Sequence, residues 1–225
     1  MIPDRSLPAL RAAAVVALTL ATLSLADSVA VDPHKWLYAP IEAGCALVRD
    51  AEALRAAFAY HPPYYHFEER GVNYVEYGPQ NTRGFRALKV WLALRQAGAA
   101  GYRRMIGDDM LLARAMADAI GRAPDLECVT QALSITTFRF VPADLRSRAA
   151  EAAVAEYLNT LNQRLLETSQ QGGEAFVSNA VIGGRYLLRA CIVNFHTRLA
   201  DVQAVPEIIV RLGRQLDREL RPAGL

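Results

Sequence analysis

The chain has 225 residues, of which 52% are hydrophobic and 21% are charged, and its formal net charge at pH 7 is +2. This composition supports a folded core, and it excludes both an intrinsically disordered chain and the strongly basic surface of a nucleic-acid-binding protein. The length suits one domain or two small ones.

The first predicted feature is an apolar run near the amino terminus. Arg5 and Arg11 lead into residues 12–26, where small residues close the run, and this arrangement is typical of a secretory signal. The run is shorter than the ~20 residues that a membrane span needs. Two interpretations stay open: a secretory segment, or a divergent or misread edge of a longer protein that covers residues 1–25.

Two short strands and a helix are predicted next. Ser28–Val31 reads as a strand that enters an Asp32–Pro33 turn, and Ala43–Arg49 reads as a second, buried strand. Residues 50–57 suit one or two helical turns. Residues 59–80 follow with five tyrosines and no clear period. Such a long irregular segment in a compact chain is more often a functional loop than a linker.

Two helices are predicted between residues 82 and 122. Thr82 is expected to cap the first helix and Gly98 to end it. The second helix is expected over residues 101–122. The helical spacing gives the first helix an apolar face of Phe85, Leu88, Trp91, Leu92 and Leu94.

The remaining residues predict an α+β unit. Alternation over residues 126–142 indicates two antiparallel strands, and residues 143–170 form an amphipathic pattern typical of a helix. Residues 174–194 read as a hairpin with a two-glycine turn. A terminal helix is expected to run to about Leu220, with Pro206 in its first turn, where proline is tolerated.

The three cysteines carry a prediction about the compartment. Cys45, Cys128 and Cys191 are odd in number, far apart and set among apolar residues. This pattern favours buried, reduced thiols over a disulfide framework or a metal site. We therefore expect a reducing compartment, the cytoplasm, and no metal.

One segment places a lysine between an imidazole and an indole: "ADSVAVDPHKWLYAP", residues 26–40. Pro33 fixes the backbone before His34, so Lys35 should leave a rigid turn, and Trp36–Tyr38 should form an apolar wall that shields its amine from water. A lysine in such surroundings can react with an aldehyde. The competing interpretation is a surface lysine beside a half-buried tryptophan.

This segment resembles the lysine motif of the group II pyridoxal-phosphate-dependent decarboxylases, the family of aromatic-L-amino-acid and glutamate decarboxylases. The resemblance implies that Lys35 binds pyridoxal 5′-phosphate covalently and that Asp32 and His34 contact its phosphate. It also implies a catalytic tyrosine on a mobile flap, which matches Tyr64 in "FAYHPPYYHF", with Tyr65 as the alternative. The expected catalytic residues are thus Lys35, His34 and Tyr64.

Two further segments carry the likeness, "NTRGFRALKVWLALRQAG" at residues 81–98 and "YLLRACIVNFHT" at residues 186–197. They resemble the family's Arg-Phe-Arg-x-Leu-Lys helix and its carboxyl-terminal strand. The implied fold is α/β, the carboxyl-terminal part of a fold-type I enzyme. Residues 26–110 would end the large cofactor-binding domain, and residues 111–225 would form the small α+β domain. The family's earlier half has no match in residues 1–25.

The function implied by the resemblance is that of a carboxy-lyase acting on an amino acid, with Trp36 and the flap tyrosines favouring an aromatic one, although the glutamate and diaminobutyrate branches stay open. It also implies a homodimer with no nucleic-acid or membrane partner. Two other interpretations remain: a non-catalytic fragment or pseudoenzyme that only dimerises, and a transaminase of the same fold type, although the His-Lys-Trp context indicates a decarboxylase.

Overall fold

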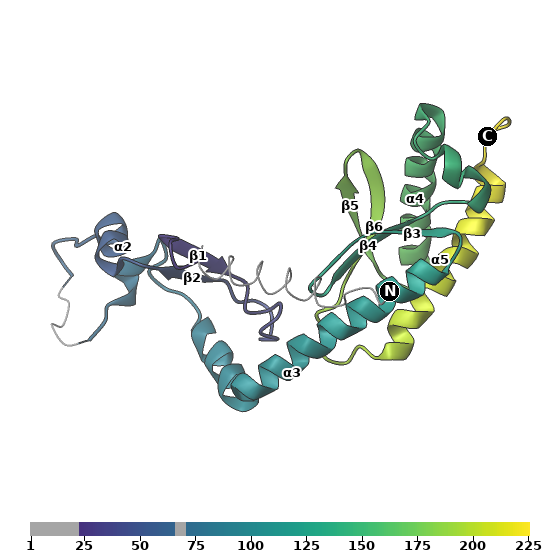
Figure 1. Ribbon diagram of the computed structural model, residues 1–225. Helices are drawn as coiled ribbons and strands as arrows, with labels where there is room; N and C mark the ends of the chain where they lie inside the picture. Colours follow the sequence, from purple (N-terminus) through teal and green to yellow (C-terminus); the bar gives the residue numbers. More distant parts are fainter. Residues whose placement is uncertain (1–22, 66–70) are drawn as a thin grey trace. The chain divides into compact units, whose positions relative to one another are not determined.

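A computed structural model describes residues 23–65 and 71–225 (Figure 1). The chain divides into two compact units, Met1–Gln96 and Ala97–Leu225, and each is described by itself. Most of the predicted amino-terminal segment precedes residue 23 and lies outside the described residues.

The first unit contains a two-stranded antiparallel sheet. Strand β1 (Ser28–Val31) pairs with strand β2 (Cys45–Val48), and Val31 lies opposite Cys45. The lysine motif therefore fills the loop of a hairpin. Strand β1 is where the sequence predicts it, but β2 is shorter than Ala43–Arg49 and is exposed rather than buried. A pair of strands alone has too little apolar surface to bury its residues.

Two short helical segments follow β2, and the predicted irregular segment begins after the first of them. Helix α2 (Ala51–Phe58) confirms the predicted helical turns, and the Asp50 carboxylate caps it by accepting two backbone N–H groups of its first turn at 3.0 Å. A 3₁₀ turn, η1 (Tyr74–Tyr77), lies within the predicted irregular segment 59–80. The described part of that segment contains no α-helix or strand.

Helix α3 (Arg86–Arg122) contains both predicted helices, which meet at a kink. Gly98 has non-helical backbone angles, φ 62° and ψ 172°, so the first helical stretch ends where the sequence predicts it to end. Thr82 is not the cap, because the helix begins at Arg86. The predicted apolar face of the first half exists but is exposed, with Phe85 and Trp91 among its exposed residues. The predicted domain boundary after residue 110 falls inside α3 and stays a prediction.

The second unit has the predicted α+β composition. Its four-stranded antiparallel sheet has the order β3-β4-β6-β5. Gly183 and Gly184 connect the last two strands with φ values of 56° and 74°, which is the left-handed backbone of the predicted two-glycine turn. The strands are β3 (Leu126–Ala132), β4 (Ile135–Phe140), β5 (Ser178–Ile182) and β6 (Arg185–Cys191).

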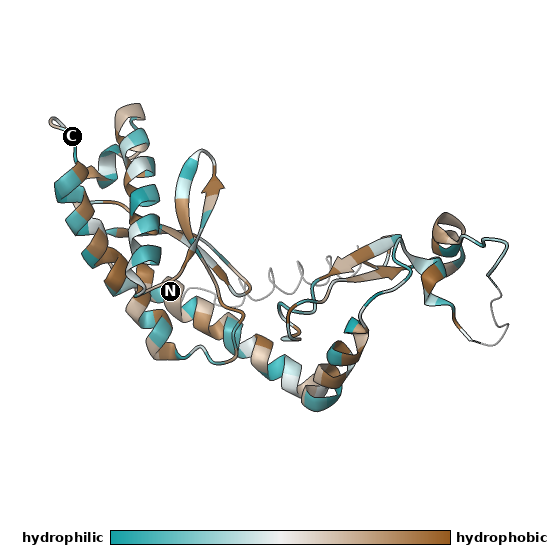
Figure 2. Cartoon of the chain, turned by 180° about the vertical axis from the view of Figure 1, so that it is seen from behind, coloured by the Kyte–Doolittle hydropathy of each residue, from teal (hydrophilic) through white to brown (hydrophobic). Residues whose placement is uncertain are grey.

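Two helices pack on this sheet, α4 (Ala152–Gly172) and α5 (Leu199–Leu220), and both carry apolar and polar residues along their length (Figure 2). The predicted helix over residues 143–170 starts instead as a 3₁₀ turn, η2 (Ala143–Arg148), before α4. Pro206 lies well inside α5 rather than in its first turn, because α5 begins earlier than predicted. No described helix is long and apolar enough to cross a membrane.

The core of the second unit joins the sheet to the helices. It includes residues of α3 as well as of α4 and α5, so the carboxyl-terminal half of α3 belongs to this unit's packing. Thr136 in β4 also donates its hydroxyl to the Ala113 carbonyl of α3 at 3.0 Å. Fully buried residues of this core include Ile120, Phe138, Leu158, Leu165 and Ile209.

The prediction of buried cysteines is wrong. Cys45, Cys128 and Cys191 are all exposed, and none forms a disulfide. Each lies on a strand, and apolar neighbours in the sequence do not reveal which of the two faces of a strand will be covered. Within residues 23–65 and 71–225, no three His, Cys, Asp or Glu side chains gather into a metal-binding group.

A buried asparagine on α4 completes the hydrogen bonding of β4. Asn162 accepts the N–H of Phe140 at 2.8 Å and donates to the Phe140 carbonyl at 2.9 Å. We expect Asn162→Leu to lower the free energy of unfolding by about 3 kcal/mol, because it leaves two buried backbone groups without partners. Urea unfolding followed by circular dichroism measures this loss.

Asn159 provides the matched control for Asn162. It makes a similar pair, donating to the Gly184 carbonyl at 2.9 Å and accepting the Tyr186 N–H at 2.8 Å, but at a more exposed edge. Water can replace part of these bonds, so Asn159→Leu should cost about 1 kcal/mol or less. Equal losses in the two variants would contradict the role assigned to Asn162.

Gly213 allows α5 to lie against Phe140. A Cβ atom at Gly213 would come within 2.5 Å of the Phe140 ring, which is buried in the core. We expect Gly213→Ala to destabilise the unit by about 2 kcal/mol, because overpacking outweighs the gain in helix propensity. Gly107→Ala on α3 is the control: nothing lies within 4 Å of its Cβ, so it should be neutral or stabilising by up to ~1 kcal/mol. Thermal unfolding should show a lower midpoint for Gly213→Ala and an unchanged or higher midpoint for Gly107→Ala.

Candidate functional site

The predicted lysine lies in a tightly wound turn between β1 and β2. The N–H of Lys35 donates to the Asp32 carbonyl, and the N–H of Tyr38 donates to the Lys35 carbonyl, each at 3.0 Å. The N–H of Ala39 closes the turn on the Pro33 carbonyl, also at 3.0 Å. Tyr38 has φ 49°, in the left-handed region, which reverses the chain direction. The backbone that carries Lys35 is thus fixed locally, as the proline predicted.

His34 links the turn to Ala43, near the end of the loop between β1 and β2. Its Nδ1 lies 2.8 Å from the carbonyl oxygen of Ala43, which is buried. A carbonyl can only accept, so the proton sits on Nδ1 and the Nε2 of the neutral ring is an acceptor.

Asp32 and Lys35 form an ion pair across the turn. The Nζ of Lys35 lies 2.5 Å from Oδ2 of Asp32, with the two side chains 65% and 45% exposed. The hydrogen bond from Lys35 and its positive charge hold the pKa of Asp32 below its usual value. The structure therefore brings three predicted residues, Asp32, His34 and Lys35, together in one turn.

The apolar wall expected around the amine is not built by its neighbours. Trp36–Tyr38 are half-buried, yet the Lys35 side chain keeps 65% of its surface exposed. The Nε1 of Trp36 is buried and has no acceptor among the described residues. An unpaired buried donor costs ~1–3 kcal/mol, so this edge of the turn has hydrogen-bonding capacity that nothing described uses.

Tyr64 lies on an exposed β-turn. The N–H of Tyr65 donates to the Pro62 carbonyl at 2.9 Å, and Pro63 occupies the second position, where its fixed φ suits the turn. Tyr64 is 74% exposed, and its ring meets that of Tyr65 edge-on, with ring centroids 5.0 Å apart. No contact recorded for residues 23–65 or 71–225 joins Tyr64 to the Lys35 turn, so this structure does not bring the predicted flap tyrosine to the lysine.

Glu76 is the residue that sequence reasoning missed. It lies in η1 and is only 5% exposed. Its carboxylate binds Arg55 and His61, which come before Tyr64 in the chain, whereas Glu76 follows it. The only available signal was a carboxylate inside the aromatic run "YVEY". A carboxylate in such a run needs a partner when it is buried.

The two arginines before and at the start of α3 fasten this region together. Arg83 donates from Nη2 to the Tyr74 carbonyl at 2.9 Å, and Arg86 donates from Nε to Oε1 of Glu42 at 2.9 Å. Arg86 also lowers the pKa of Glu42 through this hydrogen bond and its charge. Arg83 thus holds η1, and Arg86 holds the loop that follows the lysine turn.

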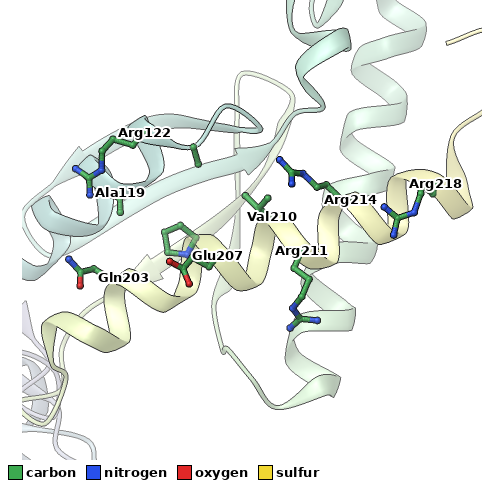
Figure 3. Close-up of a pocket in the computed structure, with 10 residues that line it drawn as sticks. Ala119, Arg122, Gln203, Glu207, Val210, Arg211, Arg214 and Arg218 are labelled. Atoms are coloured by element: carbon green, nitrogen blue, oxygen red, sulfur yellow. The ribbon is translucent and has the colours of Figure 1, made fainter.

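A separate groove lies in the second unit, between α3 and α5 (Figure 3). Its volume is about 740 Å³, and several arginines line it, with none of the predicted cofactor residues. Two of these arginines are already paired outside the groove lining, Arg214 with Asp125 at 2.6 Å and Arg211 with Glu174 at 2.5 Å. The groove is therefore not the predicted site.

Comparison with known proteins gives the chain its relatives. The family profile described as "Pyridoxal-dependent decarboxylase conserved domain" matches residues 10–141. An aromatic-L-amino-acid decarboxylase of Bacillus atrophaeus is 33% identical over 196 residues, which are 85% of this chain and 39% of the relative. Tyrosine decarboxylase 4 of Petroselinum crispum is 29% identical over 82% of this chain and 36% of its own length.

The fold has solved counterparts as well. The crystal structure of Oryza sativa TDC with PLP and tryptamine matches with a TM-score of 0.76 and 26% identity, covering 86% of this chain and 40% of that one. The chain thus spans about 40% of the length of the relatives it matches.

Proposed function

The chain belongs to the pyridoxal-dependent decarboxylase family, and we propose that it decarboxylates an amino acid with pyridoxal 5′-phosphate as its cofactor. The family resemblance and the α/β fold expected from the sequence are confirmed by these comparisons. The chain spans only 39% of the Bacillus atrophaeus relative, so its activity, substrate and partners are proposals. The observation that carries the proposal is the turn that holds Lys35, His34 and Asp32 together.

The chemistry of this turn fits the cofactor. Lys35 offers a primary amine that solvent, and hence an aldehyde, can reach. His34 is held in the same turn by the Ala43 carbonyl, and it is proposed to contact the cofactor phosphate. Asp32 orients the amine through its ion pair and stays a predicted contact of the cofactor. When bound, the cofactor supplies a ring that accepts the electron pair left behind by departing carbon dioxide.

Tyr64 is proposed to supply the proton that completes the reaction. Its hydroxyl would donate to the α-carbon of the substrate after carbon dioxide leaves, a task for which a positioned side chain gives ~10²–10⁴-fold. Because Tyr64 is exposed, its loop has to approach a lysine turn, its own or that of a second copy.

The proposed substrate, partner and compartment each rest on a separate observation. The similarity to an aromatic-L-amino-acid decarboxylase and to a tyrosine decarboxylase favours an aromatic amino acid such as tyrosine. The exposed apolar face on the first half of α3 suits a homodimer contact. Three exposed cysteines without disulfides suit the reducing cytoplasm. A non-catalytic dimerising fragment remains the alternative, and the comparisons do not support it better.

Covalent trapping tests the proposal. The chain is incubated with pyridoxal 5′-phosphate, reduced with borohydride and digested, and the modified peptide is identified by mass spectrometry. The sequence has only two lysines, Lys35 and Lys89, so the position of the added mass is easily assigned. We expect it on Lys35, together with release of carbon dioxide from tyrosine or tryptophan. A chain that takes up no cofactor at Lys35 would overturn the proposal.

A further inference from the structure

We infer that Glu76 is a positioning residue for Tyr64, because its carboxylate clamps together the two ends of the loop that carries this tyrosine. The clamp itself is a feature of the described residues. Its service to catalysis rests on the proposed function, in which Tyr64 donates a proton.

One carboxylate binds both stems of the loop. The Nε of Arg55, in the last turn of α2, donates to Oε2 of Glu76 at 2.7 Å. The Nε2 of His61 hydrogen-bonds to Oε1 of the same carboxylate. Arg55 and His61 precede Tyr64 in the chain and Glu76 follows it, so the pair of contacts closes the loop at its base.

The restraint on His61 reaches Tyr64 through a stiff connection. His61 is followed by Pro62 and Pro63, whose rings fix φ at both positions. The hydrogen bond from the Tyr65 N–H to the Pro62 carbonyl, at 2.9 Å, closes the turn that contains Tyr64. Few backbone torsions between His61 and Tyr64 are free to rotate. When Glu76 holds the His61 imidazole, the direction of the chain at Tyr64 is therefore restricted as well.

The other stem is also fixed. Arg83 donates to the carbonyl of Tyr74 at 2.9 Å and thereby holds η1, on which Glu76 lies. Glu76 is 5% exposed, whereas Tyr64 is 74% exposed. A buried carboxylate at the base of the loop thus holds the segment that carries an exposed tyrosine.

The charged groups around Glu76 determine when the clamp is closed. Arg55 and His61 face it directly, Glu52 lies 3.8 Å from Arg55, and Tyr77 follows on η1. The His61 hydrogen bond and then Arg55 hold the pKa of Glu76 below its ordinary 4.5, against the opposing effect of burial. Since the folded-state pKa is lowered, the clamp is complete above pH 4.5 and is lost as the pH falls through the lowered pKa.

Hydrogen exchange of the full chain without cofactor tests the clamp. In Glu76→Gln we expect the amide of Tyr65 to exchange about tenfold faster or more at pH 7, because the loop loses a charged partner at its base. Strands β1 and β2 should keep their protection. The control is Glu42→Gln, which removes the carboxylate of the Arg86 ion pair and should leave Tyr65 unchanged.

Two more variants separate the clamp from a general loss of fold. His61→Gln keeps a side-chain donor and should stay within a few-fold of the wild type, whereas His61→Leu should loosen the loop as Glu76→Gln does. In the wild type, corrected for intrinsic exchange, protection of Tyr65 should fall in an acid step below pH 4.5, and Glu76→Gln should lack this step. A merely structural carboxylate would not produce this matched pattern.

The outcomes are distinct for the clamp and for the proposed function. Unchanged exchange at Tyr65 in Glu76→Gln, or an equal loss of protection in β1 and β2, would overturn the inference. Failure of the wild type to trap cofactor at Lys35 would instead overturn the proposed function, and with it the catalytic service of the clamp. If both hold, Glu76→Gln should lower kcat and leave cofactor trapping at Lys35 intact.

Discussion

Lys35→Ala should abolish the covalent capture of pyridoxal 5′-phosphate. After incubation and borohydride reduction, we expect the added mass to disappear from the peptide that contains position 35, because no other amine lies in the turn between β1 and β2. The absorbance of the bound cofactor should disappear with it. Peptide mass spectrometry measures the first effect and difference spectroscopy the second.

Two further variants isolate the reason for that loss. Lys89→Ala removes the only other lysine and should leave capture at Lys35 unchanged. Lys35→Arg keeps a positive charge beside Asp32, but a guanidinium stays protonated and does not attack an aldehyde, so it should fail like the alanine variant. Capture that persists in Lys35→Ala, or that moves to Lys89 at equal yield, would contradict the assignment.

Lys35 is fixed in position by its turn but is exposed to solvent. The turn fixes the amine and pairs it with Asp32 at 2.5 Å, but it leaves the side chain 65% exposed. A site that excludes water needs walls that the half-buried Trp36–Tyr38 do not supply. The position of the Lys35 amine and its shielding from water are therefore separate properties. Capture of the cofactor tests whether the amine can react, and it does not require that water be excluded.

Local patterns predicted the elements whose structure depends on near neighbours in sequence. Strict alternation located β3 and β4, and the glycine pair located the turn between β5 and β6. The Pro33 turn before Lys35 followed from the fixed φ of proline. The motif alone also brought Asp32 and His34 beside the lysine, because all three belong to one turn.

Features set by distant contacts were not predictable in this way. The burial of the two halves of α3 is one such feature: residues of its second half pack in the core, whereas the apolar face of its first half is exposed. Pro206 is another, because it lies inside α5 with its side chain buried. Glu76 was missed because Arg55 and His61 are far from it in sequence and follow no periodic spacing. Residue type alone shows neither partner.

Tyr64→Phe should slow amine formation by ~10²–10⁴-fold while leaving capture of the cofactor at Lys35 unchanged. The substitution removes only the hydroxyl that would donate a proton to the α-carbon. The edge-on contact with Tyr65, at 5.0 Å between ring centroids, is kept, so the turn should keep its packing. Amine release per trapped cofactor, with tyrosine or tryptophan as substrate, measures the effect.

Neighbouring tyrosines decide whether position 64 is the right one. Tyr60→Phe changes another exposed tyrosine of the same loop, 77% exposed, and should leave turnover unchanged. Tyr65→Phe tests the alternative flap residue, because it removes the adjacent hydroxyl and keeps the same pair of rings. A loss confined to Tyr65→Phe would transfer the proton-donating role to that residue. Undiminished amine formation in both Tyr64→Phe and Tyr65→Phe would show that the proton comes from elsewhere, since neither hydroxyl would then be needed for the final step.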